Sequence, residues 1–193
     1  MSQRYEVRFS GRGGQGVVLA AIVMAEAAAA SKKGQKVVQT VHYGPQVRGG
    51  LSNAELIISN EDIDYPLPMG LDLLIPFTEQ SMEESAQSMK ETGIILYDPL
   101  LVAKVRQGWA APILMTDLAI DTTGRKQMAN IVALGAASVF CPYLNQAGVT
   151  FALKARAPEG LGEAFSKAAA AGEKAARKIK GHLHFEATPS PED

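Results

Sequence analysis

The chain has a single cysteine, and this scarcity excludes several classes of site. One thiol forms no internal disulfide, no four-cysteine zinc site and no iron–sulfur cluster. The flanking residues, Val139-Phe140 before Cys141 and Pro142-Tyr143 after it, are largely apolar and predict a packed thiol rather than a nucleophile. Metal chemistry would therefore have to come from a partner.

Long apolar segments are also missing. No run of about eighteen apolar residues occurs, so no membrane span is expected. The residues from Met1 to Tyr5 enter a predicted strand without an apolar signal region. We therefore expect a soluble, cytoplasmic protein.

Net charge is nearly absent, because 19 Lys and Arg oppose 20 Asp and Glu. This balance argues against general nucleic-acid binding. The charges are uneven: residues 1–50 carry seven basic and two acidic side chains, and residues 51–100 carry one and ten. Such asymmetry fits an anionic ligand near the N-terminal third, and it also fits two solvated surfaces of opposite sign.

The chain of 193 residues, 47% of them hydrophobic, is long enough to bury a core as one domain, expected over residues 1–181. Residues 182–193 are polar and contain proline, which predicts a flexible tail.

The most informative feature present is a glycine-rich loop, Gly11-Arg12-Gly13-Gly14-Gln15-Gly16. It lies between an alternating strand, residues 5–10, and an apolar helix, residues 17–30. Glycines let backbone amides approach an anion, and the helix adds unpaired N–H groups and the positive end of its dipole. The loop therefore predicts a binding site for phosphate or pyrophosphate, and the positive charge of Arg12 supports this interpretation. The alternative is a tight turn whose glycines are needed only for packing.

The glycine spacing also satisfies the dinucleotide pattern G-x-G-x-x-G. A nicotinamide enzyme usually carries an acidic residue at the end of the second strand. Here that strand, residues 35–41, is followed by His42, beside which the sequence fixes no carboxylate. A free-standing nucleotide-binding protein using Gly11–Gly16 therefore remains only an alternative.

The periodicity predicts an α/β layered fold with a mixed, mostly parallel sheet and a helical C-terminal part. The second and third strands have no helix between them, so we expect antiparallel neighbours. Strands are expected at residues 5–10, 35–41, 53–59, 71–77, 93–98 and 111–115. Helices are expected at residues 17–30, 78–90, 121–139, 149–154 and 159–180.

A second glycine-rich segment follows the second strand: Tyr43-Gly44-Pro45-Gln46-Val47-Arg48-Gly49-Gly50. With both segments, and with Ala54-Glu55-Leu56-Ile57-Ile58-Ser59 and Ile63-Asp64-Tyr65-Pro66 after them, the chain resembles γ subunits of the 2-oxoacid:ferredoxin oxidoreductases. Asn130 with Leu134-Gly135-Ala136 resembles a later motif. Leu161-Gly162-Glu163-Ala164-Phe165 departs from the family, where many relatives have an asparagine. The residues of these motifs resemble most closely those of subunits in the 2-oxoglutarate branch of the family.

The resemblance implies a subunit that is inert alone, in a complex that converts a 2-oxoacid to acyl-coenzyme A and reduces ferredoxin. It implies thiamine diphosphate, Mg and iron–sulfur clusters on partner subunits of α, β and δ type. The Gly-Asp-Gly signature of a Mg-diphosphate site is absent from this sequence. Alternatives are the smaller subunit of indolepyruvate:ferredoxin oxidoreductase and a purely structural interaction module.

The resemblance assigns no catalytic or metal-binding residue to this chain, but it suggests that the glycine loop contacts coenzyme A or forms part of the wall of the active-site channel. The candidate contacts are Gly11, Arg12, Gly13, Gly14, Gln15, Gly16, Tyr43, Gly44, Arg48, Gly49 and Gly50. Arg48 would contact an anion through both guanidinium arms, and an ion pair with Glu55 is the alternative. The apolar helix over residues 17–30 also suggests partners, including a homodimer of the isolated chain.

Overall fold

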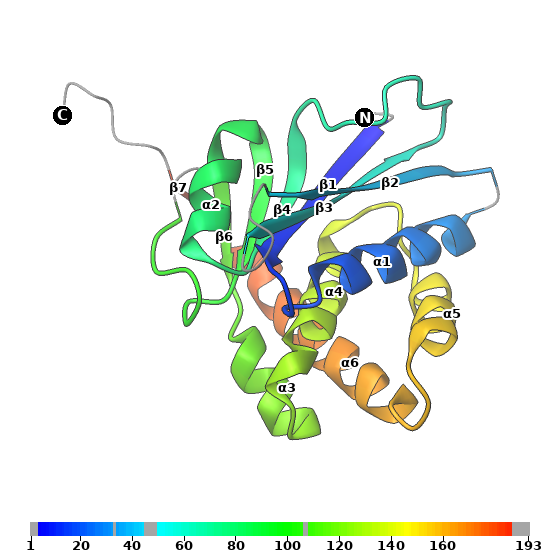
Figure 1. Cartoon of the computed structure of the whole chain (residues 1–193), viewed down its shortest axis with the longest axis vertical. Coiled ribbons are helices and arrows are strands. Elements are labelled where there is room, and N and C mark those ends of the chain that lie inside the picture. The colour runs from blue at the N-terminus through cyan, green and yellow to red at the C-terminus, as the bar shows by residue number, and fades with distance from the viewer. Residues whose placement is uncertain (1–3, 33, 45–49, 106–107, 187–193) are drawn as a thin grey trace.

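A seven-stranded mixed sheet forms the centre of the computed structural model, which describes residues 4–32, 34–44, 50–105 and 108–186 (Figure 1). Within these residues the strand order is β2-β3-β1-β4-β5-β6-β7. The strands are β1 (Arg4–Arg12), β2 (Lys36–Tyr43), β3 (Leu51–Ser59), β4 (Leu71–Pro76), β5 (Met89–Tyr97), β6 (Gly108–Pro112) and β7 (His184–Glu186). The run β1-β4-β5-β6 is parallel, and the pairings β1–β3, β2–β3 and β6–β7 are antiparallel. The expected mixed sheet and the antiparallel second and third strands are confirmed.

The helices cover the two faces of the sheet unequally (Figure 1). They are α1 (Val17–Ser31), α2 (Glu79–Ser85), α3 (Met115–Thr123), α4 (Ala129–Phe140), α5 (Gln146–Arg156) and α6 (Gly162–Ile179). The main core joins one sheet face, including Phe9, Leu56 and Ile75, to α1 and α4. A smaller core lies on the other face, where Leu74 of β4 meets Met82 of α2. This arrangement is the layered α/β fold expected from the sequence.

Helix α1 is buried on several sides, as its apolar sequence predicts. It packs against β3, β2 and β1 and against helices α4 and α5. Gly148 of α5 permits close approach, because a Cβ there would lie 2.4 Å from the carbonyl oxygen of Ala27. The described fold thus covers much of the apolar helix within the chain itself.

Three expected boundaries were wrong. The helix expected over 78–90 begins under a Thr78 cap but ends at Ser85, because Met89 and Lys90 already belong to β5. The strand expected over 111–115 ends at Pro112, and Met115 begins α3. The helix expected over 121–139 is two helices, because Gly124 takes a φ of 69° and stops α3.

Part of the predicted tail is ordered. A 3₁₀ turn (Lys180–His182) leads into β7, which pairs antiparallel with β6. Residues 187–193 lie outside the described residues, so a flexible end remains a prediction for them. The domain assignment to residues 1–181 likewise remains a prediction.

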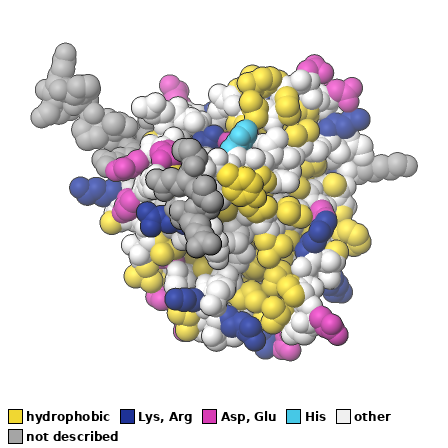
Figure 2. All heavy atoms as spheres, viewed as in Figure 1, with side chains coloured by type: hydrophobic (Ala, Val, Ile, Leu, Met, Phe, Trp, Pro, Cys, Tyr) yellow, Lys and Arg dark blue, Asp and Glu magenta, His cyan; other side chains and the backbone are white. Residues whose placement is uncertain are grey.

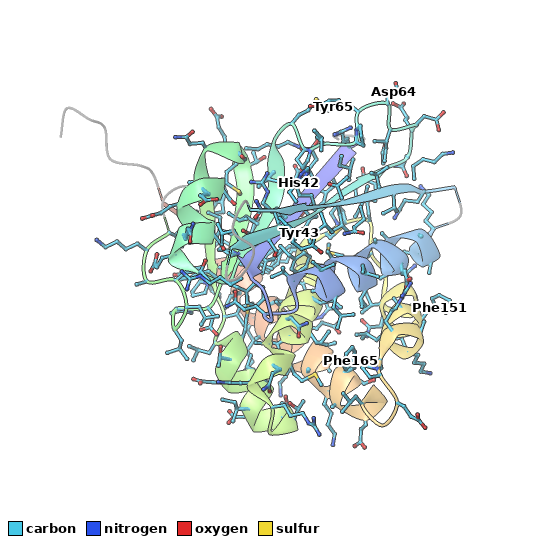
Figure 3. The ribbon with its side chains drawn as sticks, in the orientation of Figure 1. His42, Tyr43, Asp64, Tyr65, Phe151 and Phe165 are labelled. Carbon is cyan, nitrogen blue, oxygen red and sulfur yellow. The ribbon has the colours of Figure 1, made fainter. Side chains whose placement is uncertain are left out.

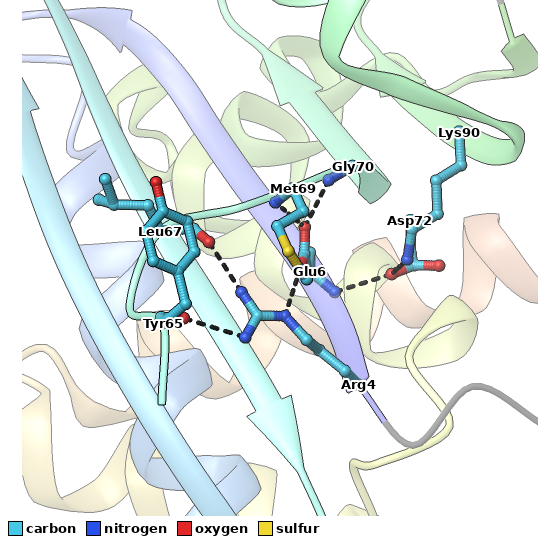
Figure 4. Close-up of polar contacts among 8 residues, drawn as sticks. All are labelled: Arg4, Glu6, Tyr65, Leu67, Met69, Gly70, Asp72 and Lys90. Atoms are coloured by element: carbon cyan, nitrogen blue, oxygen red, sulfur yellow. Dashed lines mark hydrogen bonds and ion pairs between the residues drawn. The ribbon is translucent and has the colours of Figure 1, made fainter. Parts of the chain in front are cut away.

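A buried acidic residue fixes the loop that carries the Ile63–Pro66 motif (Figure 4). The Glu6 carboxylate, 1% exposed, accepts hydrogen bonds of 2.7 Å from the backbone N–H groups of Met69 and Gly70 and pairs with Arg4 at 2.5 Å. The Arg4 guanidinium donates to the carbonyl oxygens of Tyr65 and Leu67. The buried charge is therefore compensated, and the loop is held against β1.

Candidate functional site

The glycine loop connects β1 directly to α1. Gly14 and Gly16 have φ angles of 90° and 72°, values that side-chain-bearing residues rarely adopt. Gly16 is the N-cap of α1, no side chain of the described residues caps this helix, and its first turn holds no acidic residue. The amide groups of the first turn therefore remain available to an anion.

The side chain of Gln15 joins the glycine loop to the residue that follows β4. Its Oε1 accepts a hydrogen bond of 2.6 Å from the Arg12 backbone N–H, and its Nε2 donates at 3.0 Å to the carbonyl oxygen of Phe77 after β4. A Cβ on Gly11 would lie 2.6 Å from that same Oε1 and 3.0 Å from Val17. Packing thus accounts for Gly11, and two hydrogen bonds fix the side chain of Gln15; both residues remain predicted ligand contacts.

Gly16 is also required by packing. Its carbonyl oxygen accepts a 3.0 Å hydrogen bond from Nδ2 of Asn130, a buried residue near the start of α4. A Cβ on Gly16 would lie 2.2 Å from this nitrogen. By contrast, a Cβ on Gly13 or Gly14 would meet nothing within 4 Å. Packing therefore does not explain these two exposed glycines.

The described ends of the second glycine-rich segment lie near the first segment. Gly11 of β1 pairs with Ser52 of β3, and Ser52 pairs with Tyr43 at the end of β2. Two strand spacings, about 10 Å, therefore separate Gly11 from Tyr43. Gly44 follows and donates its N–H to the carbonyl oxygen of Leu51 at 2.8 Å. Gly50 is described immediately before β3, whereas Arg48 and Gly49 lie outside the described residues.

A pocket of about 290 Å³ lies on one side of the glycine loop. It is lined by Gly14, Gln15, Phe77, Leu101, Thr116, Lys126, Gln127 and Ala129. The lining residues after β4 and β5 lie at the carboxyl ends of parallel strands, where open α/β sheets bind ligands. Lys126 supplies a cation to this lining, and Thr116 supplies a hydroxyl group. The pocket therefore suits an anionic group.

Asp98, directly after β5, organises one wall of this pocket. Its buried carboxylate accepts hydrogen bonds from the backbone N–H of Thr116 at 2.8 Å and from the Thr116 hydroxyl at 2.6 Å. It also accepts from the backbone N–H of Leu100 at 3.0 Å. Asp98 thus fixes the start of α3 rather than facing a ligand alone.

The exposed Tyr43 is not part of the pocket lining, although it lies near the loop (Figure 3). Beside it, Nε2 of His42 lies 3.5 Å from Oε2 of Glu55, so the structure supplies the carboxylate that the sequence did not fix. Glu55 also forms a 2.6 Å ion pair with Arg8. The carboxylate considered as an alternative partner for Arg48 is therefore already engaged.

The prediction of a packed thiol is confirmed. Cys141 is 3% exposed and belongs to the main core. Burial raises the pKa of this thiol to about 12, which keeps it protonated at neutral pH.

Sequence reasoning missed most of the pocket wall, because its residues come from four separate segments. Phe77 ends one predicted strand and Leu101 follows another, and the rule that ligands bind at strand carboxyl ends would have indicated them. Thr116 lies where the predicted end of a strand was wrong, and Lys126 lies where one helix was predicted instead of two. Asn130 was identified only as part of a motif, whereas the structure shows its contact with Gly16.

The strand order argues against a dinucleotide-binding enzyme. In that fold the second strand lies beside the first and parallel to it. Here β3 lies between β1 and β2 and is antiparallel to both. The G-x-G-x-x-G spacing thus occurs in a different sheet topology.

Comparison with known proteins decides the family. Residues 6–178 match the model of the pyruvate ferredoxin/flavodoxin oxidoreductase family. The chain belongs to this family. The resemblance of its two glycine-rich segments to oxidoreductase subunits is therefore confirmed, and the chain is homologous to subunits of an oxidoreductase family.

Two relatives of this family member match over nearly their full length. The chain is 34% identical to 2-oxoglutarate synthase subunit KorC of Methanocaldococcus jannaschii, covering 86% of this chain and 93% of the relative. It is 37% identical to the solved γ subunit of a keto/oxoacid ferredoxin oxidoreductase from Geobacter sulfurreducens, with a TM-score of 0.82, covering 91% and 97% of the two chains.

A more distant structure shares the fold. The 2-oxoglutarate:ferredoxin oxidoreductase of Magnetococcus marinus is 20% identical with a TM-score of 0.81, and the match covers all of this chain and 34% of the larger one. In the described part of this family member, no helix is both long and apolar enough to span a membrane.

Proposed function

We propose that the chain is the γ subunit of a multi-subunit 2-oxoacid:ferredoxin oxidoreductase acting on 2-oxoglutarate. The observation that carries this proposal is the near-complete overlap with relatives named 2-oxoglutarate synthase subunit KorC. A relative named ketoisovalerate oxidoreductase subunit VorA matches over only 48% of this chain and 19% of its own length. The 2-oxoglutarate branch is therefore the better supported choice.

In this proposal the chain is inactive alone and completes a site on partner subunits of α, β and δ type. Its single cysteine cannot hold a four-cysteine iron–sulfur cluster. Thiamine diphosphate, Mg and the clusters would be bound by the partners, which would pass electrons to ferredoxin. The complex would act in the cytoplasm.

The proposed role of this chain is to hold a phosphate group of coenzyme A in the pocket beside the glycine loop. A related structure, from Magnetococcus marinus, is described with coenzyme A and succinyl-CoA bound. A pocket of about 290 Å³ takes part of a coenzyme A molecule. The remainder would extend toward a partner subunit, so that the acyl-transfer site lies between chains.

Different residues around the loop would contact the phosphate in different ways. Gly13 and Gly14 leave open space at the loop, so their backbone can approach a phosphate closely. Lys126 would donate a charge-assisted hydrogen bond to the phosphate, and Thr116 a neutral one. Tyr43, Gly44, Gly50 and Arg12 would contact parts of the ligand outside this pocket, and Arg48 and Gly49, which lie outside the described residues, remain predicted contacts.

Kinetics of the assembled complex test the site. Lys126→Ala would raise the apparent KM for coenzyme A roughly tenfold or more and leave kcat nearly unchanged, since a charged hydrogen bond contributes about 1.5–3 kcal/mol. The assay is anaerobic reduction of a viologen dye that depends on 2-oxoglutarate and coenzyme A. Lys154→Ala removes an exposed cation of α5 that does not line the pocket, and it is the matched control.

The outcomes separate the subunit role from the coenzyme A site. An active complex whose KM for coenzyme A is unchanged in Lys126→Ala and in Arg48→Ala would overturn the ligand assignment and leave the subunit role standing. A tagged chain that captures no thiamine-containing complex from its native cells would overturn the subunit role.

A further inference from the structure

Strand β2 is the free edge of the sheet. It pairs with β3 from Lys36 opposite Ser59 to Tyr43 opposite Ser52, and in the described sheet it has no strand on its other side. Figure 1 shows β2 in front of the sheet and lying along α1. Edge strands present a row of unpaired backbone groups that bind another strand.

The hydrogen-bond pattern shows which residues face outward. Gly44 donates its N–H to Leu51 of β3, so position 44 faces β3. In an antiparallel pair, the backbone N–H and C=O groups of successive residues point alternately toward the partner strand and away from it. The residues whose N–H and C=O groups point away from the sheet are therefore Val37, Gln39, Val41 and Tyr43.

This edge lacks the usual protection against pairing. Between Lys36 and His42 the sequence is Val-Val-Gln-Thr-Val, without charge or proline. Tyr43 is 72% exposed. Figure 2 shows hydrophobic side chains gathered beside a histidine on this face, at the place where Figure 3 labels Tyr43 next to His42. The five uncharged residues 37–41 thus form a partly apolar stretch of this edge that is open to a partner.

We propose that β2 pairs antiparallel with β2 of a second copy of this chain, about a two-fold axis at Thr40. This register places Val37 opposite Tyr43 of the second copy and Gln39 opposite its Val41. All the outward-facing residues then form hydrogen-bonded pairs, whereas an axis at Gln39 leaves Tyr43 unpaired.

In this register the side chains of β2 are compatible with the residues that they face in the second copy. Lys36 lies opposite Gly44, so no like charges meet. Thr40 meets Thr40, and Tyr43 meets the β-branched Val37; both are favourable cross-strand pairs. We therefore assign a second copy to this edge, because an axis at Thr40 pairs every outward-facing residue and brings no like charges together.

Helix α1 leaves room for the pairing. Helix α1 makes its main sheet contact with β3, one strand in from the edge. Three strand spacings, about 14 Å, would separate the two α1 axes across the dimer. Because a helix with its side chains is about 10 Å across, the two helices do not collide.

Engineered cysteines test both the dimer and its register. Thr40→Cys places two thiols opposite each other, with Cα atoms about 4.5 Å apart, within the range for a disulfide. Gln39→Cys is the matched control, because in this register two copies of position 39 are about 9 Å apart. An equal mixture of Gln39→Cys and Val41→Cys chains should cross-link again, since these positions face each other. The native Cys141 is buried and gives little background.

The full chain should sediment as a dimer at micromolar concentration, and mild oxidation should convert most of Thr40→Cys, but not Gln39→Cys, to a covalent dimer. A monomeric chain would overturn the proposal, as would equal cross-linking by the two variants. Cross-linking of Thr40→Cys only to another subunit of a purified complex would also overturn it and place that subunit's strand on β2. None of these outcomes depends on coenzyme A or on the proposed substrate.

Discussion

Single glycines serve two purposes in the loop between β1 and α1. Gly11 and Gly16 are fixed by neighbours that a Cβ would strike, whereas Gly13 and Gly14 face open space. The two interpretations offered by the sequence, packing and anion binding, thus apply to different glycines of one motif. A functional test of the loop should therefore avoid the packed pair.

The free energy of unfolding distinguishes the two groups. Gly16→Ala should destabilise the chain by about 2–3 kcal/mol, because a left-handed alanine is strained and the Asn130 hydrogen bond is displaced. Gly13→Ala should change the free energy of unfolding by less than about 0.5 kcal/mol. Urea denaturation followed by circular dichroism measures both. Equal stability of the two variants would contradict the role given to Gly16.

At the scale of secondary structure elements, α4 and α6 form the closest helix contact. A Cβ on Gly172 of α6 would lie 1.9 Å from the carbonyl oxygen of Val132, and one on Gly135 of α4 would lie 2.0 Å from that of Ala169. Both glycines therefore permit backbone contact between the helices. Each glycine can be read from the sequence, but the helix that it approaches is known only from the fold.

Gly172→Ala should destabilise the chain by about 3 kcal/mol, because the backbones of α4 and α6 must separate. Gly162→Ala, in the open first turn of α6, should be neutral or stabilise by up to about 1 kcal/mol through helix propensity. Thermal unfolding of the two variants gives the comparison. If Gly172→Ala melted with the unsubstituted chain, the close contact would be disproved.

At the scale of the whole molecule, stability should fall in alkaline solution. Burial raises the pKa of Cys141 from 9.0 to about 12 and that of Tyr5 above its usual value. Because the pKa of Cys141 is higher in the folded state than in the unfolded state, the protonated thiol contributes fully to the free energy of unfolding below pH 9. This contribution is lost as the pH rises toward 12. The loss from Cys141 should approach about 1.4 kcal/mol per pH unit.

Urea denaturation at pH 8, 9 and 10 measures this loss. Cys141→Ala removes the titrating thiol, so its free energy of unfolding should fall less between pH 9 and pH 10 than that of the unsubstituted chain. The difference between the two slopes, rather than the absolute stability, is the relevant quantity. Parallel slopes would show that Cys141 does not couple folding to protons.

The sequence by itself determined the features that depend on neighbouring residues. Alternation and apolar runs predicted the first strands and the layered α/β class, and the two glycine-rich segments identified the family. The predicted bounds around Ser85, Met115 and Gly124 were wrong. Strand pairing of β5 ends the first helix early, the Asp98 contact fixes the start of α3, and Gly124 in a left-handed conformation ends α3.

Only the tertiary structure decided which distant segments meet. The insertion of β3 between β1 and β2 brings Gly11 and Tyr43 to one end of the sheet and leaves β2 as the free edge. The pocket joins Gly14 to Lys126 across more than a hundred residues. Such contacts arise from long-range hydrogen bonding and burial, which the local pattern of a single chain does not encode.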